Sequence, residues 1–264
     1  MRVYSICNFK GGTGKTITCV NLTANLARCG KRVLAIDADP QHNLTDFFCE
    51  DWDGETLTDV LEGTADPYYP ENLADSGYNN LSVLCSDMGL LRLDLAAILN
   101  GSNEAQRRMA DLFAAMAQDD AFDFVLIDCP PSFTAASVAA LANSDGLILP
   151  TRLDAWSRRG VVEMIEQARS AGRHLSNMDI RVLLTMVDKS NLARQGEEIL
   201  RGMEGLNVYD TVIHAGVAAG ESTYVRQPLY EYKPRSRVAR DYEALLREVL
   251  EWEPEGGVSD GEKV

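Results

Sequence analysis

The feature that most restricts the fold of this chain is a regular alternation of short apolar segments with helical patterns. Segments such as RVLAID, FDFVLID and RVLLTMV are almost continuously apolar, which is typical of strands covered on both faces. Stretches with the amphipathic spacing of helices separate these segments. Parallel strands need a crossover after each strand, and a helix is the usual crossover. The alternation therefore predicts an α/β fold with a doubly wound, mostly parallel β-sheet flanked by helices.

The expected elements follow one another without a long linker or an internal repeat. A short irregular, acidic section is expected after RVLAID. The final helix carries an apolar stripe, Val238, Tyr242, Leu245, Val249 and Trp252. We predict one domain over residues 1–252 and a polar, disordered acidic tail over 253–264. The expected strands are VYSIC, RVLAID, LSVLC, FDFVLID, GLILP, RVLLTMV and VYDTVI, and the other helices fall within 16–29, 90–118, 135–142, 157–171, 193–203 and 217–225.

Composition narrows the functional classes. No apolar run approaches the roughly 18 residues of a membrane span, and the first residues resemble a strand rather than a signal peptide. A cytoplasmic location is predicted. The six cysteines include no C-x-x-C pair, which is typical of reduced thiols rather than a metal site. A net charge of −15 argues against a surface that attracts nucleic acid broadly.

A glycine-rich loop, KGGTGKT, joins the first strand to the first helix. Such a loop leaves backbone N–H groups unpaired at a helix N-terminus, where they bind phosphate. Lys15 is expected to reach the β- and γ-phosphates, and the Thr16 hydroxyl to bind Mg²⁺. A second lysine, Lys10, precedes the loop, and the usual first glycine of the motif is missing. The predicted nucleotide-binding residues of the loop are Gly11, Gly12, Thr13, Gly14, Lys15, Thr16 and Ile17.

Carboxylates end two of the apolar strands, at the sheet edge where open α/β folds bind ligands. Asp128 ends FDFVLID and is the candidate metal ligand. Asp37 and Asp39 follow the strand RVLAID, Asp37 for the metal shell and Asp39 to position the attacking water or to hold metal-bound water. For Asp37 alone, a structural helix-capping role is an open alternative.

KGGTGKT, DADPQHN and FDFVLIDCPPS, in this order and spacing, resemble the ParA/MinD family of deviant Walker ATPases. Within it the chain is similar to the ParA (Soj) chromosome and plasmid partition proteins. The similarity continues through TMVDKSNLARQ, VYDTVI and YKPRSRVARDYEALLREV, and it covers residues 1–252. The three motifs together are specific, whereas any one alone is not.

The resemblance implies a Mg²⁺-dependent ATP hydrolase that forms a sandwich homodimer in the ATP state. Lys10 matches the family's signature lysine, which reaches the phosphates bound by the partner subunit. With Lys15 and Asp39 it completes the expected catalytic set. The family also implies that a ParB-like protein stimulates hydrolysis. Adenine is expected to pack against Met186, Asp188, Ala215, Gly216 and Val217, although Met186 also suits the core.

Binding of the dimer to non-specific DNA is implied as well, but the sequence departs from the family pattern. Ala215 and Ala218 stand where relatives carry arginines, and His42 replaces a common glycine. The remaining basic residues are therefore either DNA contacts or partners of surface acids. These candidate DNA-binding residues are Arg226, Lys233, Arg235, Arg237 and Arg240.

Two alternatives within the family stay open. One is a ParA-like ATPase that positions cargo on a scaffold other than DNA. The other is a MinD-like membrane-associated ATPase, which needs a basic amphipathic C-terminal helix. The tail EWEPEGGVSDGEKV has five acids and one lysine, so no membrane association is expected. The acidic run 46–75 is a conjectured target for a basic peptide of the activator.

Overall fold

A computed structural model describes residues 1–65, 73–101, 103–154, 157–170 and 178–252. Its centre is an eight-stranded sheet with the order β3-β4-β2-β5-β1-β6-β7-β8. Every strand pair is parallel except β3 with β4. This topology confirms the predicted fold class. The predicted tail, 253–264, lies outside the described residues. The strands are β1 (Arg2–Ile6), β2 (Val33–Asp37), β3 (Ala74–Asp75), β4 (Leu81–Leu84), β5 (Phe124–Asp128), β6 (Gly146–Arg152), β7 (Asp179–Thr185) and β8 (Asn207–Val208).

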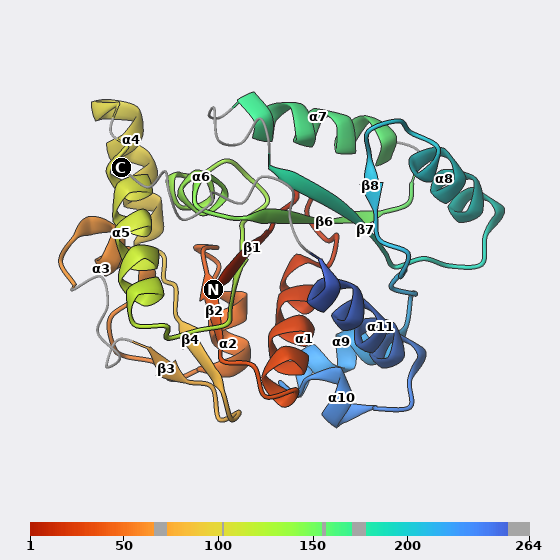
Figure 1. Ribbon diagram of the computed structural model, residues 1–264, viewed down its shortest axis with the longest axis horizontal. Coiled ribbons are helices and arrows are strands. Elements are labelled where there is room, and N and C mark those ends of the chain that lie inside the picture. The colour runs from red at the N-terminus through yellow and green to blue at the C-terminus, as the bar shows by residue number, and fades with distance from the viewer. Residues whose placement is uncertain (66–72, 102, 155–156, 171–177, 253–264) are drawn as a thin grey trace.

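Helices cover both faces of the sheet (Figure 1). Side chains alternate across the strands, so Val125 packs into one apolar cluster and Leu126 into the other. Helices α3 to α8 contribute to the first cluster, and α1, α2 and α9 to α11 to the second. The helices are α1 (Lys15–Arg28), α2 (Asn43–Phe48), α3 (Leu57–Glu62), α4 (Leu90–Asn100), α5 (Glu104–Gln118), α6 (Ala135–Ala142), α7 (Ser157–Ser170), α8 (Asn191–Arg201), α9 (Val217–Tyr224), α10 (Leu229–Tyr232) and α11 (Arg237–Glu251).

The prediction of a strand over VYDTVI is wrong for most of that segment. Only Asn207 and Val208 of this region form β8, and an isolated bridge joins His214 to Val187. Between these points the backbone N–H groups of Asp210 and Thr211 donate to the Glu248 carboxylate of α11, at 2.9 and 2.7 Å. A side chain of α11 thus takes the hydrogen bonds that a strand would give to its neighbour.

The acidic section after β2 is more regular than expected. It contains the short helices α2 and α3, and the antiparallel strand β3 follows them. Helix α3 begins with a capping box between Thr56 and Asp59 and ends at Gly63 in a left-handed conformation, with φ 76°. These local signals explain why six residues form a helix there.

Residue Trp252, directly after α11, packs the end of the described chain against strands β1 and β7. Trp252 is 1% exposed and stacks on Tyr4 of β1, with the ring centroids 4.5 Å apart. Its indole N–H donates to the Asp179 carboxylate at 2.6 Å. The helix α11 therefore holds the sheet from the second face, as its predicted apolar stripe indicated.

Candidate functional site

The glycine-rich loop leaves β1 and ends in the first turn of α1. Gly14 is the residue before α1 and has a left-handed backbone with φ 89°, and Gly12 has φ 69°. Both values favour glycine because a Cβ strains this conformation. The loop is fixed from two sides: the Thr185 hydroxyl donates to the carbonyl of Thr13 at 2.7 Å, and the Asn8 side chain donates to the carbonyl of Pro150 at 2.7 Å.

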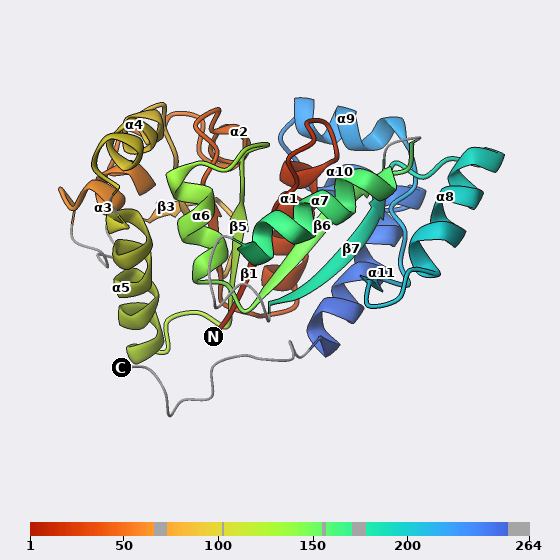
Figure 2. The same ribbon diagram turned by 90° about the horizontal axis from the view of Figure 1, so that it is seen from above.

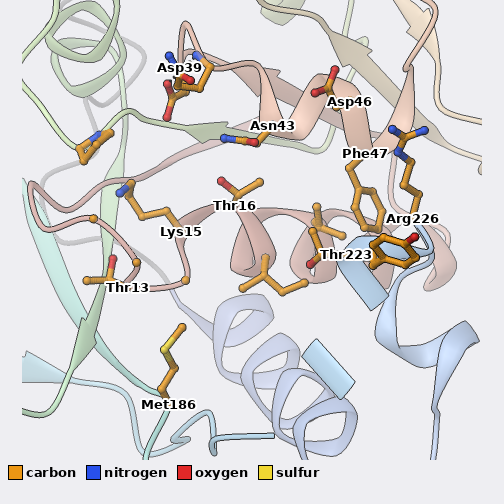
Figure 3. Close-up of a pocket in the computed structure, with 18 residues that line it drawn as sticks. Thr13, Lys15, Thr16, Asp39, Asn43, Asp46, Phe47, Met186, Thr223 and Arg226 are labelled. Atoms are coloured by element: carbon orange, nitrogen blue, oxygen red, sulfur yellow. Dashed lines mark hydrogen bonds between the residues drawn. The ribbon is translucent and has the colours of Figure 1, made fainter. Parts of the chain in front are cut away.

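The loop borders a cleft of about 700 Å³ that runs along the exposed side of α1 (Figure 3). The seven predicted loop residues, 11–17, all line this cleft, and so do Asp39 and Met186. Lys15 is 8% exposed, and its ammonium group lies 3.5 Å from the carbonyl oxygen of Lys10. A cation and the first-turn N–H groups of α1 therefore face one concave space, which suits an anionic ligand.

Two carboxylates lie beneath this loop, in register on neighbouring strands. Asp37 of β2 is opposite Asp128 of β5. The Thr16 hydroxyl donates to Asp128 Oδ2 at 2.6 Å. The other oxygen, Asp128 Oδ1, is buried and has no hydrogen-bond partner among the described residues. Burial, and next the negative charge of Asp37, hold the pKa of Asp128 well above its usual range.

Asp37 has a different environment, because internal donors occupy both of its oxygens. Oδ1 accepts from the Asp39 backbone N–H at 3.1 Å, and Oδ2 accepts from the backbone and hydroxyl of Thr45, both at 2.9 Å. Thr45 lies in the first turn of α2, so Asp37 caps this helix from the end of β2. These contacts support the capping alternative, and a place for Asp37 in a metal shell stays a prediction.

Asp39 is positioned at the edge of the cleft by its own backbone. Its carboxylate accepts from the Gln41 backbone N–H at 2.9 Å, and its carbonyl accepts from the Ser86 hydroxyl at 2.9 Å. The side chain is 8% exposed. This arrangement fixes a carboxylate across the cleft from the loop, as Figure 3 shows.

Lys10 does not line the cleft. Its side chain is 49% exposed and forms an ion pair with Asp154, which follows β6. It borders a smaller pocket of about 230 Å³ with Arg159 and Glu163 of α7. The predicted signature lysine therefore lies outside the cleft that the loop residues line.

The predicted adenine contacts are only partly gathered at the cleft. Met186 lines it with a left-handed backbone, φ 51°, and a Cβ placed on Gly14 would lie 4.0 Å from the Met186 methyl group. Asp188, Ala215, Gly216 and Val217 are not among the lining residues. Their contact with a base stays a prediction.

Sequence reasoning missed several residues that line the cleft. Phe47 of α2 and Tyr224 of α9 face the same groove from different elements, and no motif joins them. The signal that could have suggested them is that their segments follow the carboxyl ends of strands, where open α/β sheets bind ligands. The missed lining residues are Val20, Gln41, Asn43, Asp46, Phe47, Pro131, Thr223 and Tyr224.

Of the five candidate DNA-binding residues, four side chains have internal partners. Arg226 pairs with Glu50, Lys233 with Glu221, and Arg237 contacts His214. Arg226 also lines the nucleotide cleft. The guanidinium of Arg240 donates to backbone carbonyls of Arg235 and Ser236, at 3.1 and 3.4 Å. No acidic partner of Arg235 or Arg240 is recorded in the described part of the chain, so these two are the most available cations of the set.

A glycine-rich loop between a strand and a helix, with its lysine and threonine above a buried aspartate, defines a P-loop nucleotide-binding protein. A family model described as an AAA domain matches residues 1–182. The sporulation initiation inhibitor protein Soj of Bacillus subtilis is 35% identical over 94% of this chain and 98% of Soj. The chromosome partitioning protein ParA of Caulobacter vibrioides is 32% identical over 95% of this chain and 94% of ParA. The chain belongs to the ParA/MinD family of P-loop ATPases.

Solved structures agree with this assignment. The cell division ATPase MinD of Pyrococcus furiosus has a TM-score of 0.75 at 26% identity, over 95% of this chain and 98% of that chain. The ATP complex of Cyanothece McdA(D38A) has a TM-score of 0.80 at 21% identity, over 96% of this chain and 97% of that chain. The McdA likeness shows the fold alone.

Proposed function

We propose that this chain is a ParA-like partition ATPase that is switched by Mg²⁺-dependent ATP hydrolysis. The observation that carries the proposal is the phosphate loop poised above Asp128, in a chain related to Soj over 94% and to ParA over 95% of its length. In this proposal ATP drives two copies together, the dimer binds non-specific DNA, and a ParB-like partner stimulates hydrolysis and release during chromosome or plasmid segregation.

The residues at the loop fit ATP and Mg²⁺. The buried, unpartnered Oδ1 of Asp128 and the neighbouring Thr16 hydroxyl supply two hard oxygen ligands, which Mg²⁺ prefers. Within the described residues no cluster of three His, Cys, Asp or Glu side chains forms a metal cage. A metal bound by one carboxylate, one hydroxyl and the substrate phosphates is the arrangement expected for such a site. The ion neutralises charge on the β- and γ-phosphates when it is bound.

The protein side chains would then perform three tasks. Lys15 and the loop N–H groups bind the phosphates and align the γ-phosphoryl group. Asp39 orients the attacking water from across the cleft. Lys10, offered to the nucleotide of the facing copy, stabilises the charge that spreads over the γ-phosphoryl group in the transition state.

The position of Lys10 supports a role between subunits. Its ammonium group lies outside the cleft of its own chain and contacts Asp154. To serve a neighbouring phosphate, Lys10 must exchange this carboxylate for the phosphate oxygens. Hydrolysis would therefore depend on the approach of the second copy, which couples the chemistry to the assembled state.

One observation favours a second candidate, a cargo-positioning relative whose scaffold is not DNA. Arginines of relatives are replaced by Ala215 and Ala218, and the net charge is −15. Arg235 and Arg240 alone make a modest cationic patch, which dimerisation would double. A MinD-like membrane role has less support, because the tail EWEPEGGVSDGEKV carries five acids and one lysine and is unsuited to anionic lipid. No helix among the described residues is long and apolar enough to cross a bilayer.

Filter binding with non-specific duplex DNA separates these functions. The chain is tested with ADP or ATP at two salt concentrations. Retention that needs ATP and falls at high salt supports the partition function. Replacement of both Arg235 and Arg240 by alanine removes four cations from the dimer and should lower the salt slope by about 4, whereas Arg169→Ala on α7 serves as the control. No retention with ATP at low salt would move the scaffold away from DNA.

A further inference from the structure

Helix α4 exposes a line of large apolar side chains that we call the α4 stripe. Its members are 43% to 81% exposed. They recur at helical spacing and therefore share one side of the helix. Among the side chains of α4 that the structure describes, only Leu90 is buried. The stripe consists of Met88, Leu91, Leu95, Ile98 and Leu99.

Helix α4 packs Leu90 and Leu93 against the core, yet its outer side is also apolar, which is unusual for a surface helix. A helix at the edge of a fold turns its apolar side to the core and its polar side to water. Contiguous apolar patches of several hundred Å² are rare on monomers and mark interaction sites. The α4 stripe is therefore a candidate docking surface.

The stripe is mechanically connected to the nucleotide site. Asp94 of α4 accepts a hydrogen bond from the backbone N–H of Ala135 at 2.6 Å. Ala135 ends the loop that follows Asp128, and Phe133 of this loop packs against Phe9 beside the phosphate loop, with ring centroids 4.2 Å apart. Figure 2 shows α4 at the same edge of the molecule as α2 and the phosphate loop. A molecule bound to α4 would thus press on the loop next to the metal aspartate.

The charges beside the stripe indicate which occupant it suits. Arg92 of α4 forms an ion pair with Glu62, and Asp87 and Asp59 also act on its guanidinium group. One carboxylate, Glu62, thus contacts Arg92, and Asp59 and Asp87 add negative charge to this flank. A second copy that docked by the same patch would bring like charges together, and anionic lipid would be repelled. A polypeptide with a basic rim is complementary to this flank.

We propose that the α4 stripe binds an amphipathic helix with an apolar face and a Lys/Arg rim, carried by the activating partner. This inference rests on the proposed function, because it assigns a docking site to the partner that stimulates hydrolysis. Apolar side chains of the partner cover the stripe, and its basic rim faces the Asp59, Glu62 and Asp87 flank. Docking transmits strain through Asp94 to the loop after Asp128, which is how binding alters the hydrolysis rate.

The test is fluorescence anisotropy of a labelled Leu/Lys amphipathic helix of about 15 residues titrated with the full chain. A second peptide has the same composition in an order that gives no apolar face. The double variant Leu95→Gln with Ile98→Gln should weaken binding of the amphipathic peptide by ~10-fold or more, and the reordered peptide should bind equally weakly to all forms. Ile199→Gln, on the exposed side of α8, is the matched control and should bind like the wild type.

Three results would overturn the inference. Equal binding by wild type and the stripe variant means that charge alone attracts the peptide. Equal binding of both peptides to the wild type also means that charge alone, without an apolar face, attracts the peptide. A change in the oligomeric state of the variant assigns the stripe to a second copy. The titration needs no nucleotide, so the docking inference can be refuted while the protein still hydrolyses ATP. Conversely, a wild type without ATP hydrolysis would refute the proposed function and leave the peptide result unchanged.

Discussion

At the scale of single residues, the two lysines of the loop have opposite surroundings. Lys15 is nearly buried and faces the cleft, whereas Lys10 is half exposed and contacts Asp154 at the rim. The residue types are the same, so the difference in role comes from direction and burial. In the proposed function, Lys15 serves the nucleotide of its own chain, and Lys10 would leave Asp154 to serve the nucleotide of a second copy.

Lys10→Ala should separate binding from hydrolysis. Nucleotide affinity should change less than about 3-fold, because Lys10 does not line the cleft. Hydrolysis should fall by ~100-fold or more, since a cation is lost from the transition state. Titration with a fluorescent ATP analogue and phosphate-release kinetics measure the two quantities. Lys31→Ala, after the far end of α1, is the control, and an unchanged rate in Lys10→Ala would refute the trans-acting role.

The buried carboxylates make a prediction about pH. Burial is the main reason that the pKa of Asp37 is raised from 3.8 to about 6, against the hydrogen bonds from Thr45 and Asp39. The folded state holds this proton more tightly than the unfolded chain does. The contribution of this bound proton to the free energy of unfolding is therefore complete below pH 3.8 and is lost as the pH rises through about 6.

Asp37→Asn should flatten this part of the stability profile, measured as the midpoint of thermal unfolding across that pH range without nucleotide. Asp123→Asn tests the sign. The guanidinium of Arg32 lowers the pKa of Asp123, so this carboxylate stabilises the fold above its ordinary pKa and loses the effect in acid. Parallel profiles for wild type and Asp37→Asn would show that the Asp37 proton does not contribute.

At the scale of elements, features that depend on neighbouring residues could be predicted from the sequence, whereas features that depend on distant contacts could not. The phosphate loop is recognisable because its determinants, the strand, the glycines and the helix start, are consecutive. His42, which replaces a common glycine of the family, has a left-handed backbone with φ 45°, a conformation that favours glycine. The prediction of a strand over VYDTVI is wrong because Glu248, far along the chain, accepts hydrogen bonds from the backbone of this segment. Asp154, Phe47 and Tyr224 were missed for the same reason, since their importance depends on elements that meet only in the folded chain.

The contacts of Trp252, directly after α11, should contribute several kcal/mol to the free energy of unfolding. Trp252→Ala removes the stack on Tyr4 and the hydrogen bond to Asp179, and leaves a cavity. The free energy of unfolding should fall by about 3–5 kcal/mol in urea denaturation. Arg247→Ala, exposed on the same helix, should change it by less than about 0.5 kcal/mol. A loss below about 1 kcal/mol in Trp252→Ala would mean that α11 does not hold the sheet.

At the scale of the whole molecule, helix α4 and the loop that precedes α1 lie at the same edge of the molecule (Figure 2). A chain of net charge −15 does not associate through bulk attraction. In the proposed function, association instead needs a specific bridge, which two bound triphosphates, each contacted by lysines of both copies, would provide.

The most direct test of this account is the mass of the particle in solution by light scattering after gel filtration. Wild type with Mg²⁺ and a non-hydrolysable ATP analogue should have twice the mass of one chain, and wild type with ADP the mass of one. Lys10→Ala should form fewer dimers with the same analogue. Wild type that remains a single chain at saturating analogue would contradict the sandwich dimer and, with it, the hydrolysis switch.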